Sequence, residues 1–182
     1  MQLRKVAQKV VALSVGAGIL TAGAVALAPA ATASETARVT MSRYDATLLN
    51  DINQVRAAHG LRQLQLAAGT SDVAHSWACH LASNQTLEHN GALLRDLESH
   101  GSRALTRYDE NVGMSSTSTG AGWLFRAYMR SPEHRANILD PYARFIGIWT
   151  KSNNGFYYNT IDFVGSRLSS YTTTYGAMRT YC

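Results

Sequence analysis

The sequence predicts an α+β fold in which helices flank a small antiparallel sheet. Apolar residues recur at helical spacing in several stretches of the first 130 residues. Further along, residues 145–149 and 156–163 are rich in aromatic and β-branched residues and flank Asn154-Gly155, a dipeptide that marks a β-hairpin. Residues 108–114 form one more short β run. Pairing that run with the hairpin gives the sheet.

The first 33 residues have the form of a signal peptide. A basic start is followed by an apolar run from Val10 to Ala30, and Ala31-Thr32-Ala33 has the small-x-small form of a cleavage site. A membrane anchor is the alternative, because the run approaches spanning length, but its Ala and Gly content and the adjacent cleavage site favour removal. We therefore expect a secreted, extracellular protein with no stable membrane span after cleavage.

The exported part is long enough for one domain. Removal of the signal peptide leaves 149 of 182 residues, which divide into a flexible leader at 34–43, a domain at 44–164 and a polar, aromatic tail at 165–182. The formal net charge falls from +5 to +2 with the loss of Arg4, Lys5 and Lys9. No run of Lys or Arg remains, which excludes nucleic acid as a partner. We expect a monomer.

The first helices follow from apolar spacing and end signals. A helix is expected from Tyr44, with Gly60 as its C-terminal stop, and an extended connector follows. Ser71 is expected to cap a second helix that ends near Asn84 and buries one stripe: Val73, Ala74, Trp77, Ala78 and Leu81.

The later helices are shorter. One is expected over residues 92–97, closed by Gly101, and a polar loop at 115–120 precedes an amphipathic helix around Trp123 and Tyr128. That helix leads directly into residues 131–139, the stretch Ser-Pro-Glu-His-Arg-Ala-Asn-Ile-Leu.

This stretch predicts a short helix with a histidine at its mouth. Ser131 is a good N-cap, and Pro132 suits the first helical position, where its missing N–H would have had no partner. His134 is then the third helical residue, next to the positive end of the helix dipole, which disfavours protonation and keeps the imidazole able to bind a metal. The alternative is that His134 only forms a hydrogen bond with nearby backbone.

Several pieces of the chain together resemble the CAP superfamily of cysteine-rich secretory proteins, antigen 5 and pathogenesis-related proteins. They are residues 53–56 (Asn-Gln-Val-Arg), 60–64 (Gly-Leu-Arg-Gln-Leu), 87–90 (Leu-Glu-His-Asn), 109–113 (Asp-Glu-Asn-Val-Gly) and the 131–139 stretch. The resemblance extends from about Leu48 to Val164, is strongest to the bacterial secreted branch, and implies an α-β-α sandwich. Glu133 replaces the usual glycine, and Tyr128 stands where tryptophan is common. With Ser131, these two residues are expected at the rim of the cleft.

The resemblance also implies a cleft that can hold a divalent metal. His89, Glu110 and His134 match three of its lining residues, while the second glutamate of animal members falls near Ser131 and is missing. Two imidazoles and a carboxylate suit Zn²⁺ or a similar metal with an open fourth position. Two alternatives stay open: a hydrogen-bonded cluster without metal, and histidines that never meet. Asn111, which follows Glu110 on a strand, should face the opposite side and tie down an adjacent loop.

Cys79 and Cys182 are the only cysteines, and oxidation is expected in an exported protein. A disulfide between them would tie the last residue to the second helix, although a free nucleophilic Cys79 near His75 and His80 is the alternative. His75 and Cys79 lie four residues apart and could share a metal, but two ligands without a third are weak support. We expect a surface histidine beside a structural cysteine.

The sequence therefore predicts a secreted binding or interaction protein. The resemblance adds an apolar ligand, such as a lipid, a sterol or a component of the cell envelope, held near the metal-capable cleft. An extracellular metal-dependent hydrolase or protease is the alternative. The chain has neither a Gly-x-Ser-x-Gly nor a His-Glu-x-x-His motif.

Overall fold

The computed structural model describes residues 41–167 and Cys182. The chain divides into two units, residues 1–36 and 37–182, and all described residues belong to the second. The predicted signal peptide, most of the leader and nearly all of the tail lie outside the described residues. Within these residues, no helix is both long and apolar enough to cross a membrane.

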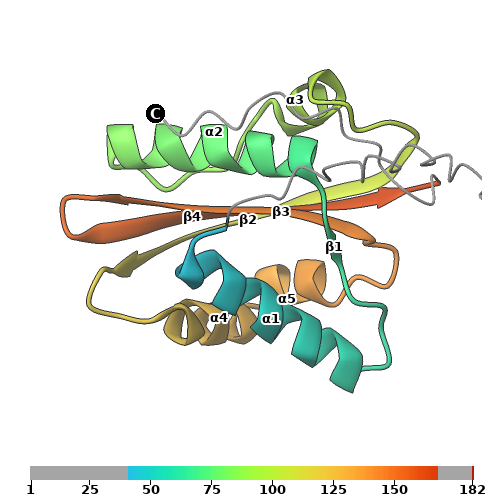
Figure 1. Ribbon diagram of the computed structural model, residues 1–182, viewed down its shortest axis with the longest axis horizontal. Helices are drawn as coiled ribbons and strands as arrows, with labels where there is room; N and C mark the ends of the chain where they lie inside the picture. The colour runs from blue at the N-terminus through green and yellow to red at the C-terminus, as the bar shows by residue number, and fades with distance from the viewer. Residues whose placement is uncertain (1–40, 168–181) are drawn as a thin grey trace, which may run out of the picture. The chain divides into compact units, whose positions relative to one another are not determined.

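The described part is an α-β-α sandwich, as predicted. A four-stranded sheet of order β1-β3-β4-β2 lies between two layers of helices, with α2 and α3 on one face and α1, α4 and α5 on the other (Figure 1). The helices are α1 (Arg43–Ala58), α2 (Ala68–Asn84), α3 (Leu93–Ser99), α4 (Ala121–Arg130) and α5 (Pro132–Ile138). The strands are β1 (Gln65–Leu66), β2 (Leu105–Ser116), β3 (Phe145–Asn153) and β4 (Phe156–Ser166).

The sheet is mixed rather than purely antiparallel. Strand β4 pairs antiparallel with both β2 and β3, and the hairpin turns at Asn154 (φ 47°) and Gly155 (φ 80°). Two residues of the predicted connector, Gln65 and Leu66, add a short parallel strand to β3. A two-residue strand has no periodicity of its own, so the sequence could indicate only an extended segment.

The domain boundaries differ slightly from the predicted ones. The Ser42 hydroxyl accepts a hydrogen bond from the Asp45 N–H and caps α1, so residues 42 and 43 belong to the domain and not to the leader. Strand β4 continues to Ser166, two residues into the predicted tail.

Helix α2 begins earlier than predicted. Its first residue is Ala68, and Ser71 lies within the first turn, fully buried. The Ser71 hydroxyl donates to the carbonyl oxygen of Ala67 at 2.9 Å instead of capping the helix. A buried serine within a helix can form this hydrogen bond with the backbone of the preceding turn. The prediction that Ser71 is the N-cap of α2 is therefore wrong.

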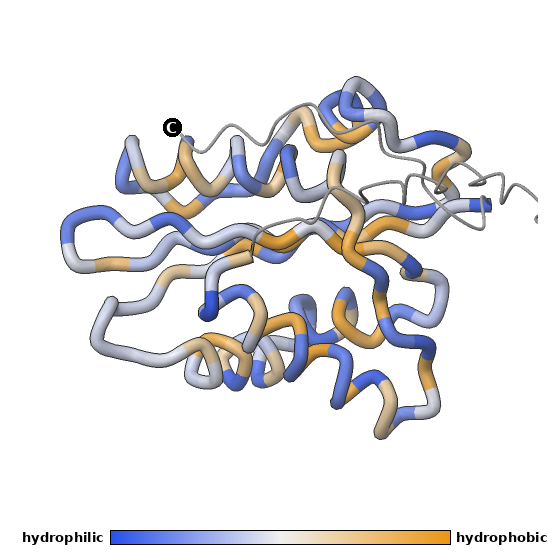
Figure 2. Tube along the Cα trace, viewed as in Figure 1, coloured by the Kyte–Doolittle hydropathy of each residue, from blue (hydrophilic) through white to orange (hydrophobic). Residues whose placement is uncertain are grey.

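Alternation along β4 sends successive residues to different cores. Ile161 and Phe163 pack with α1 and α4, whereas Val164 packs with α2 and α3. In Figure 2 the hydrophobic colour runs along the middle of the sheet, between the two helical layers. The larger core cluster includes Leu48, Ile52, Leu124, Tyr128, Ile138, Ile146, Ile148, Ile161 and Phe163.

A buried arginine joins three segments below the sheet. The guanidinium of Arg56 on α1 is inaccessible to solvent and donates to the carbonyl oxygens of Ile138 (2.8 Å) and Asp140 (2.9 Å) at the end of α5. It also donates to the carbonyls of Arg62 (2.9 Å) and Ala143 (3.2 Å). Helix α1 therefore fixes the position of the C-terminal end of α5.

Gly147 sets how closely α2 approaches the sheet. A Cβ atom at this position of β3 would collide with the backbone of Thr70 and Ser71 in the first turn of α2. We expect Gly147→Ala to lower the free energy of unfolding by about 1–3 kcal/mol, because α2 must move away from β3. Urea denaturation measures this loss. Gly91→Ala is the control, since a Cβ at Gly91 has no neighbour within 4 Å; equal stability of the two variants would contradict the close packing.

Candidate metal-binding site

The candidate site lies at the edge of the sheet formed by β2. Because β2 is an edge strand, chain from both helical layers can meet around it. Glu110 pairs with Asp162 and Asn111 with Ile161 across β2 and β4, so the two neighbours face opposite layers, as alternation requires. Glu110 faces the α2–α3 layer and Asn111 faces α5.

Glu110 makes a direct hydrogen bond with His89, which lies in the loop after α2. The Glu110 Oε1 atom lies 2.8 Å from His89 Nδ1 and accepts the Asn90 backbone N–H at 2.9 Å. Burial raises the pKa of Glu110, and these two contacts oppose the shift. When Nδ1 donates, the other ring nitrogen of His89 carries the lone pair that a metal needs. The His89 side chain is 62% exposed, so it has room to turn.

His134 approaches the same edge from α5. Its backbone N–H donates to the Ser131 hydroxyl at 3.4 Å, so the predicted N-cap is present. Burial lowers the pKa of His134, the charge of His89 lowers it further, and Glu133 opposes both. A neutral imidazole is therefore favoured at His134, as the helix position predicts.

The three predicted ligands are not equally close. His89 and Glu110 are joined by a hydrogen bond, whereas the interaction between His134 and His89 is electrostatic. Among the described residues, one group of three or more ligand-type side chains has all its ligand atoms within 4.8 Å, and it is a different one: His75, Cys79 and Cys182. His134 would have to join the other two by side-chain movement.

The expected rim residues occupy different environments. The Ser131 hydroxyl donates to the exposed Glu133 carboxylate at 2.9 Å, in keeping with a surface position. Tyr128 is only 2% exposed, and its hydroxyl donates to Asn159 Oδ1 at 2.8 Å. Its ring lies against the His134 ring at 5.1 Å. The prediction that Tyr128 lies at the rim is therefore wrong, because this face of α4 packs on the sheet.

Asn111 connects the site strand to α5. Its Nδ2 donates to the carbonyl of His134 at 3.1 Å, and its Oδ1 accepts from Asn137 Nδ2 at 2.9 Å. Asn111 is fully buried. The side chain thus holds a helix rather than the loop that we expected.

Asp162 is a site neighbour that the sequence analysis missed. It is fully buried on β4 directly opposite Glu110, and within the described chain neither of its carboxylate oxygens, nor Glu110 Oε2, has a hydrogen-bond partner. Burial, followed by the charges of Glu110 and Asp96, raises the pKa of Asp162 well above its ordinary value. The signal was present in the sequence as an acidic residue inside an aromatic and β-branched run.

The donor set fits a divalent metal of borderline softness. The unpartnered Glu110 Oε2 is a buried oxygen without a proton donor, and His89 and His134 each offer an imidazole nitrogen. A bound ion could satisfy the orphaned oxygen.

The second predicted cluster differs from expectation. Cys79 and Cys182 form the predicted disulfide, with Cα atoms 5.4 Å apart. His75, expected at the surface, is only 6% exposed, and its ring packs on Trp149 with centroids 4.4 Å apart. The surface prediction is wrong because this side of α2 lies on β3.

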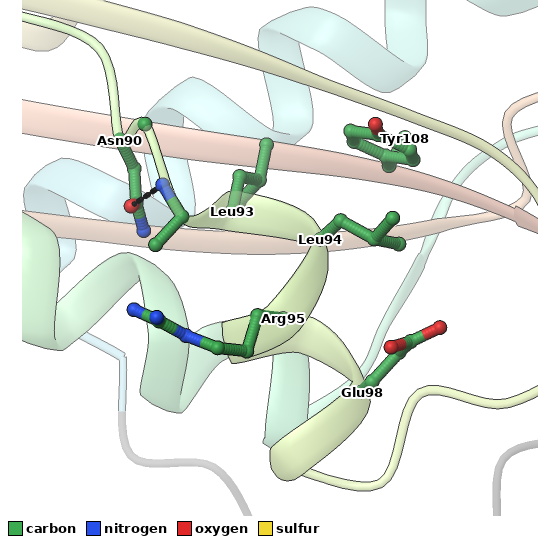
Figure 3. Close-up of a pocket in the computed structure, with 8 residues that line it drawn as sticks. Asn90, Leu93, Leu94, Arg95, Glu98 and Tyr108 are labelled. Atoms are coloured by element: carbon green, nitrogen blue, oxygen red, sulfur yellow. Dashed lines mark hydrogen bonds between the residues drawn. The ribbon is translucent and has the colours of Figure 1, made fainter.

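A surface groove begins beside the site. A cavity of about 400 Å³ runs along α3 from Asn90, and a second of about 680 Å³ continues it along β2, sharing Leu94, Glu98 and Tyr108. Figure 3 shows Leu93 and Leu94 extending from α3 on the side of Tyr108, with Arg95 and Glu98 at the margin. Leu94 and Tyr108 are exposed, so the groove combines apolar and charged surface.

The sequence of residues 49–165 matches the model of the cysteine-rich secretory protein family, CAP. The chain belongs to this family. The matched part contains α2 to α5, strands β1 to β3, all but the last residue of β4, and each of His89, Glu110 and His134. No curated protein sequence matches the chain.

Solved structures agree on the fold. An outer surface protein of Borrelia burgdorferi is 16% identical, with a TM-score of 0.60, covering 67% of this chain and 92% of that protein. An extracellular protein with an SCP domain from Bacillus anthracis is 18% identical, with a TM-score of 0.55, covering 71% of this chain and 45% of that one. NaASP2, solved with Zn²⁺, is 11% identical, with a TM-score of 0.51, covering 68% and 80%.

We expect Asn111→Ala to lower stability more than metal affinity. The change removes two hydrogen bonds between a buried side chain and α5 but no proposed metal ligand, so the free energy of unfolding should fall by about 1–3 kcal/mol. Thermal unfolding and zinc titration of the same variant give the ranking. Asn84→Ala, an exposed asparagine at the end of α2, is the control. A larger loss of zinc affinity than of stability would place Asn111 among the metal-binding groups.

We expect the stability of the Asp162→Asn variant, relative to wild type, to be higher at neutral pH than at acid pH. The folded-state pKa of Asp162 lies above its unfolded value, so its stability contribution is full below the unfolded pKa and is lost as pH rises through the folded pKa. Asparagine does not titrate. The melting temperature of the variant relative to wild type should therefore rise between about pH 4 and pH 8, as differential scanning calorimetry can measure. A difference between variant and wild type that does not change with pH would contradict a buried titrating acid at Asp162.

Proposed function

We propose that this protein is an exported CAP-domain binding protein whose cleft at the edge of β2 holds a divalent metal ion. His89, Glu110 and His134 are the proposed ligands, and zinc is the proposed ion. The hydrogen bond between His89 and Glu110, beside the buried and unpartnered Glu110 Oε2, is the observation that carries the proposal.

The electrostatics of the site support metal binding. Imidazoles bind metals only when neutral, and burial together with the charge of His89 lowers the pKa of His134. NaASP2, a protein of the same fold, is a zinc-containing structure. When bound, the ion would supply a Lewis acid with an open coordination position.

The groove along α3 and β2 supports a second ligand of apolar character. It starts at Asn90, the residue after His89, and its exposed Leu94 and Tyr108 could cover an acyl chain or a sterol ring. Arg95 at the margin could pair with an anionic headgroup. We therefore propose a lipid-like component of the cell envelope as the extracellular ligand.

Zinc affinity should depend on both histidines and on pH. We expect at least a tenfold loss for His89→Ala and for His134→Ala, and little further loss in the double variant, because one imidazole and one carboxylate hold Zn²⁺ poorly. Affinity should also fall as the pH is lowered, because protons compete for the imidazoles, and the lowered pKa of His134 moves its part of the loss below the ordinary histidine range. Calorimetric titration of the oxidised, disulfide-bonded protein measures each value.

The control for this titration is His59→Ala. His59 is an exposed histidine whose ring bonds the carbonyl of Val55 at the end of α1, far along the chain from the proposed ligands. Equal affinity in all the variants would place the ion elsewhere. Peptide or ester hydrolysis that stops when a chelator is added would contradict a pure binding role.

A further inference from the structure

We propose that His75, Cys79 and Cys182 form a second metal site, which binds a thiophilic divalent ion such as Zn²⁺ when the disulfide is reduced and releases it when the disulfide forms. This site is separate from the one proposed above and does not depend on it. It would make the link between Cys182 and α2 sensitive to both metal concentration and redox state.

The geometry brings three good ligands together. His75 and Cys79 are four residues apart on α2, so their side chains lie on the same face of the helix. Cys182 reaches this face from the end of the chain, 103 residues away in sequence. One ligand atom from each residue lies within 4.8 Å of the other two. The third ligand, Cys182, is brought to His75 by its disulfide with Cys79.

The bonded and reduced forms differ in what they can bind. Zinc binds cysteine as a thiolate, and the sulfurs of a disulfide are not thiolates. A dithiol reductant transfers two electrons to the disulfide, giving two protein thiols and the oxidised reductant. Binding of Zn²⁺ to the thiols then releases two protons. The reverse, oxidation by another disulfide, re-forms the Cys79–Cys182 bond and expels the ion.

The surroundings of His75 favour a metal ligand. His75 is only 6% exposed, and its ring packs on the ring of Trp149 with centroids 4.4 Å apart. Burial lowers the pKa of His75, and the positive charge of Lys151 lowers it further. A neutral imidazole is therefore favoured at His75, and a neutral imidazole has one nitrogen whose lone pair can bind a metal.

The ligand set selects the class of ion. Two thiolates and an imidazole suit Zn²⁺ or another soft or borderline ion in tetrahedral geometry, whereas Ca²⁺ and Mg²⁺ require oxygen ligands. Three protein ligands leave one position for water. The cleft at β2 offers two imidazoles and a carboxylate instead, so thiolate coordination distinguishes the two sites.

Cobalt titration of the full exported chain tests the proposal. The protein is reduced by a phosphine, which reacts with the disulfide and water to give a phosphine oxide and two protein thiols. The remaining phosphine is then removed under anaerobic conditions. We expect the reduced protein to bind one more Co²⁺ per chain than the oxidised protein, with thiolate-to-cobalt charge-transfer absorption that zinc abolishes. His75→Ala should weaken this binding at least tenfold. His80→Ala is the matched control, since His80 lies on the same helix but pairs with Glu88 on its exposed side.

Three results would overturn the proposal. The first is the same cobalt stoichiometry in the oxidised and reduced proteins. The second is charge-transfer absorption that His75→Ala leaves unchanged, which would mean that the thiolates bind without the histidine. The third is a loss of helical circular dichroism on reduction that cobalt does not restore, because the site requires a folded α2. Failure of the site at β2 would show instead in the oxidised protein, so the two proposals fail separately.

A second measurement does not require His75→Ala to be stable. Zinc should slow re-formation of the disulfide in the reduced wild-type protein at least tenfold, because both sulfurs are then bound to the ion. The same slowing is expected in His80→Ala. Oxidation at an unchanged rate with zinc present would contradict binding to the two cysteines.

Discussion

The buried guanidinium of Arg56 is the contact on which the geometry of the candidate site depends. Helix α5 has only seven residues and could not be stable by itself. Arg56 binds the carbonyls of Ile138 and Asp140 at its C-terminal end, where the helix dipole favours a positive charge. Asn111 binds the carbonyl of His134 from the sheet. Two buried side chains thus determine where the His134 imidazole can lie.

Arg56 and the carboxylates near the candidate site differ in how fully their buried polar atoms are hydrogen-bonded. The guanidinium N–H groups of Arg56 donate to backbone carbonyl oxygens. These hydrogen bonds offset the cost of burying the charge. On the α2–α3 face of the sheet, Glu110 Oε2 and both carboxylate oxygens of Asp162 have no hydrogen-bond partner within the described chain. Buried polar groups are normally hydrogen-bonded, and exceptions to this rule are expected at functional sites. The unsatisfied carboxylates therefore point to the edge of β2, beside His89, as the functional end of the fold.

The elements that could be predicted from the sequence are those fixed by local chemistry. Ser131 and Pro132 begin α5 as expected, and Asn154-Gly155 forms the hairpin because both residues adopt positive φ. The errors arise where tertiary packing decides. Ser71 lies inside a helix, Tyr128 packs under His134, and the covered side of α2 buries His75. The pairing of β1 with β3, and the pairing of Glu110 with Asp162, are long-range contacts that no local pattern contains.

The two proposed metal sites differ chiefly in their exposure to solvent. This difference predicts different conditions for the release of the ion. The His89 side chain is 62% exposed, whereas the whole of His75 is 6% exposed. An ion held by an exposed imidazole can exchange with solvent, so binding there responds to metal concentration and pH. An ion held by His75 is shielded, and its release requires the thiolates to be lost by oxidation. Because the ion and the disulfide both use the sulfurs of Cys79 and Cys182, only one of them can link Cys182 to α2 at a time.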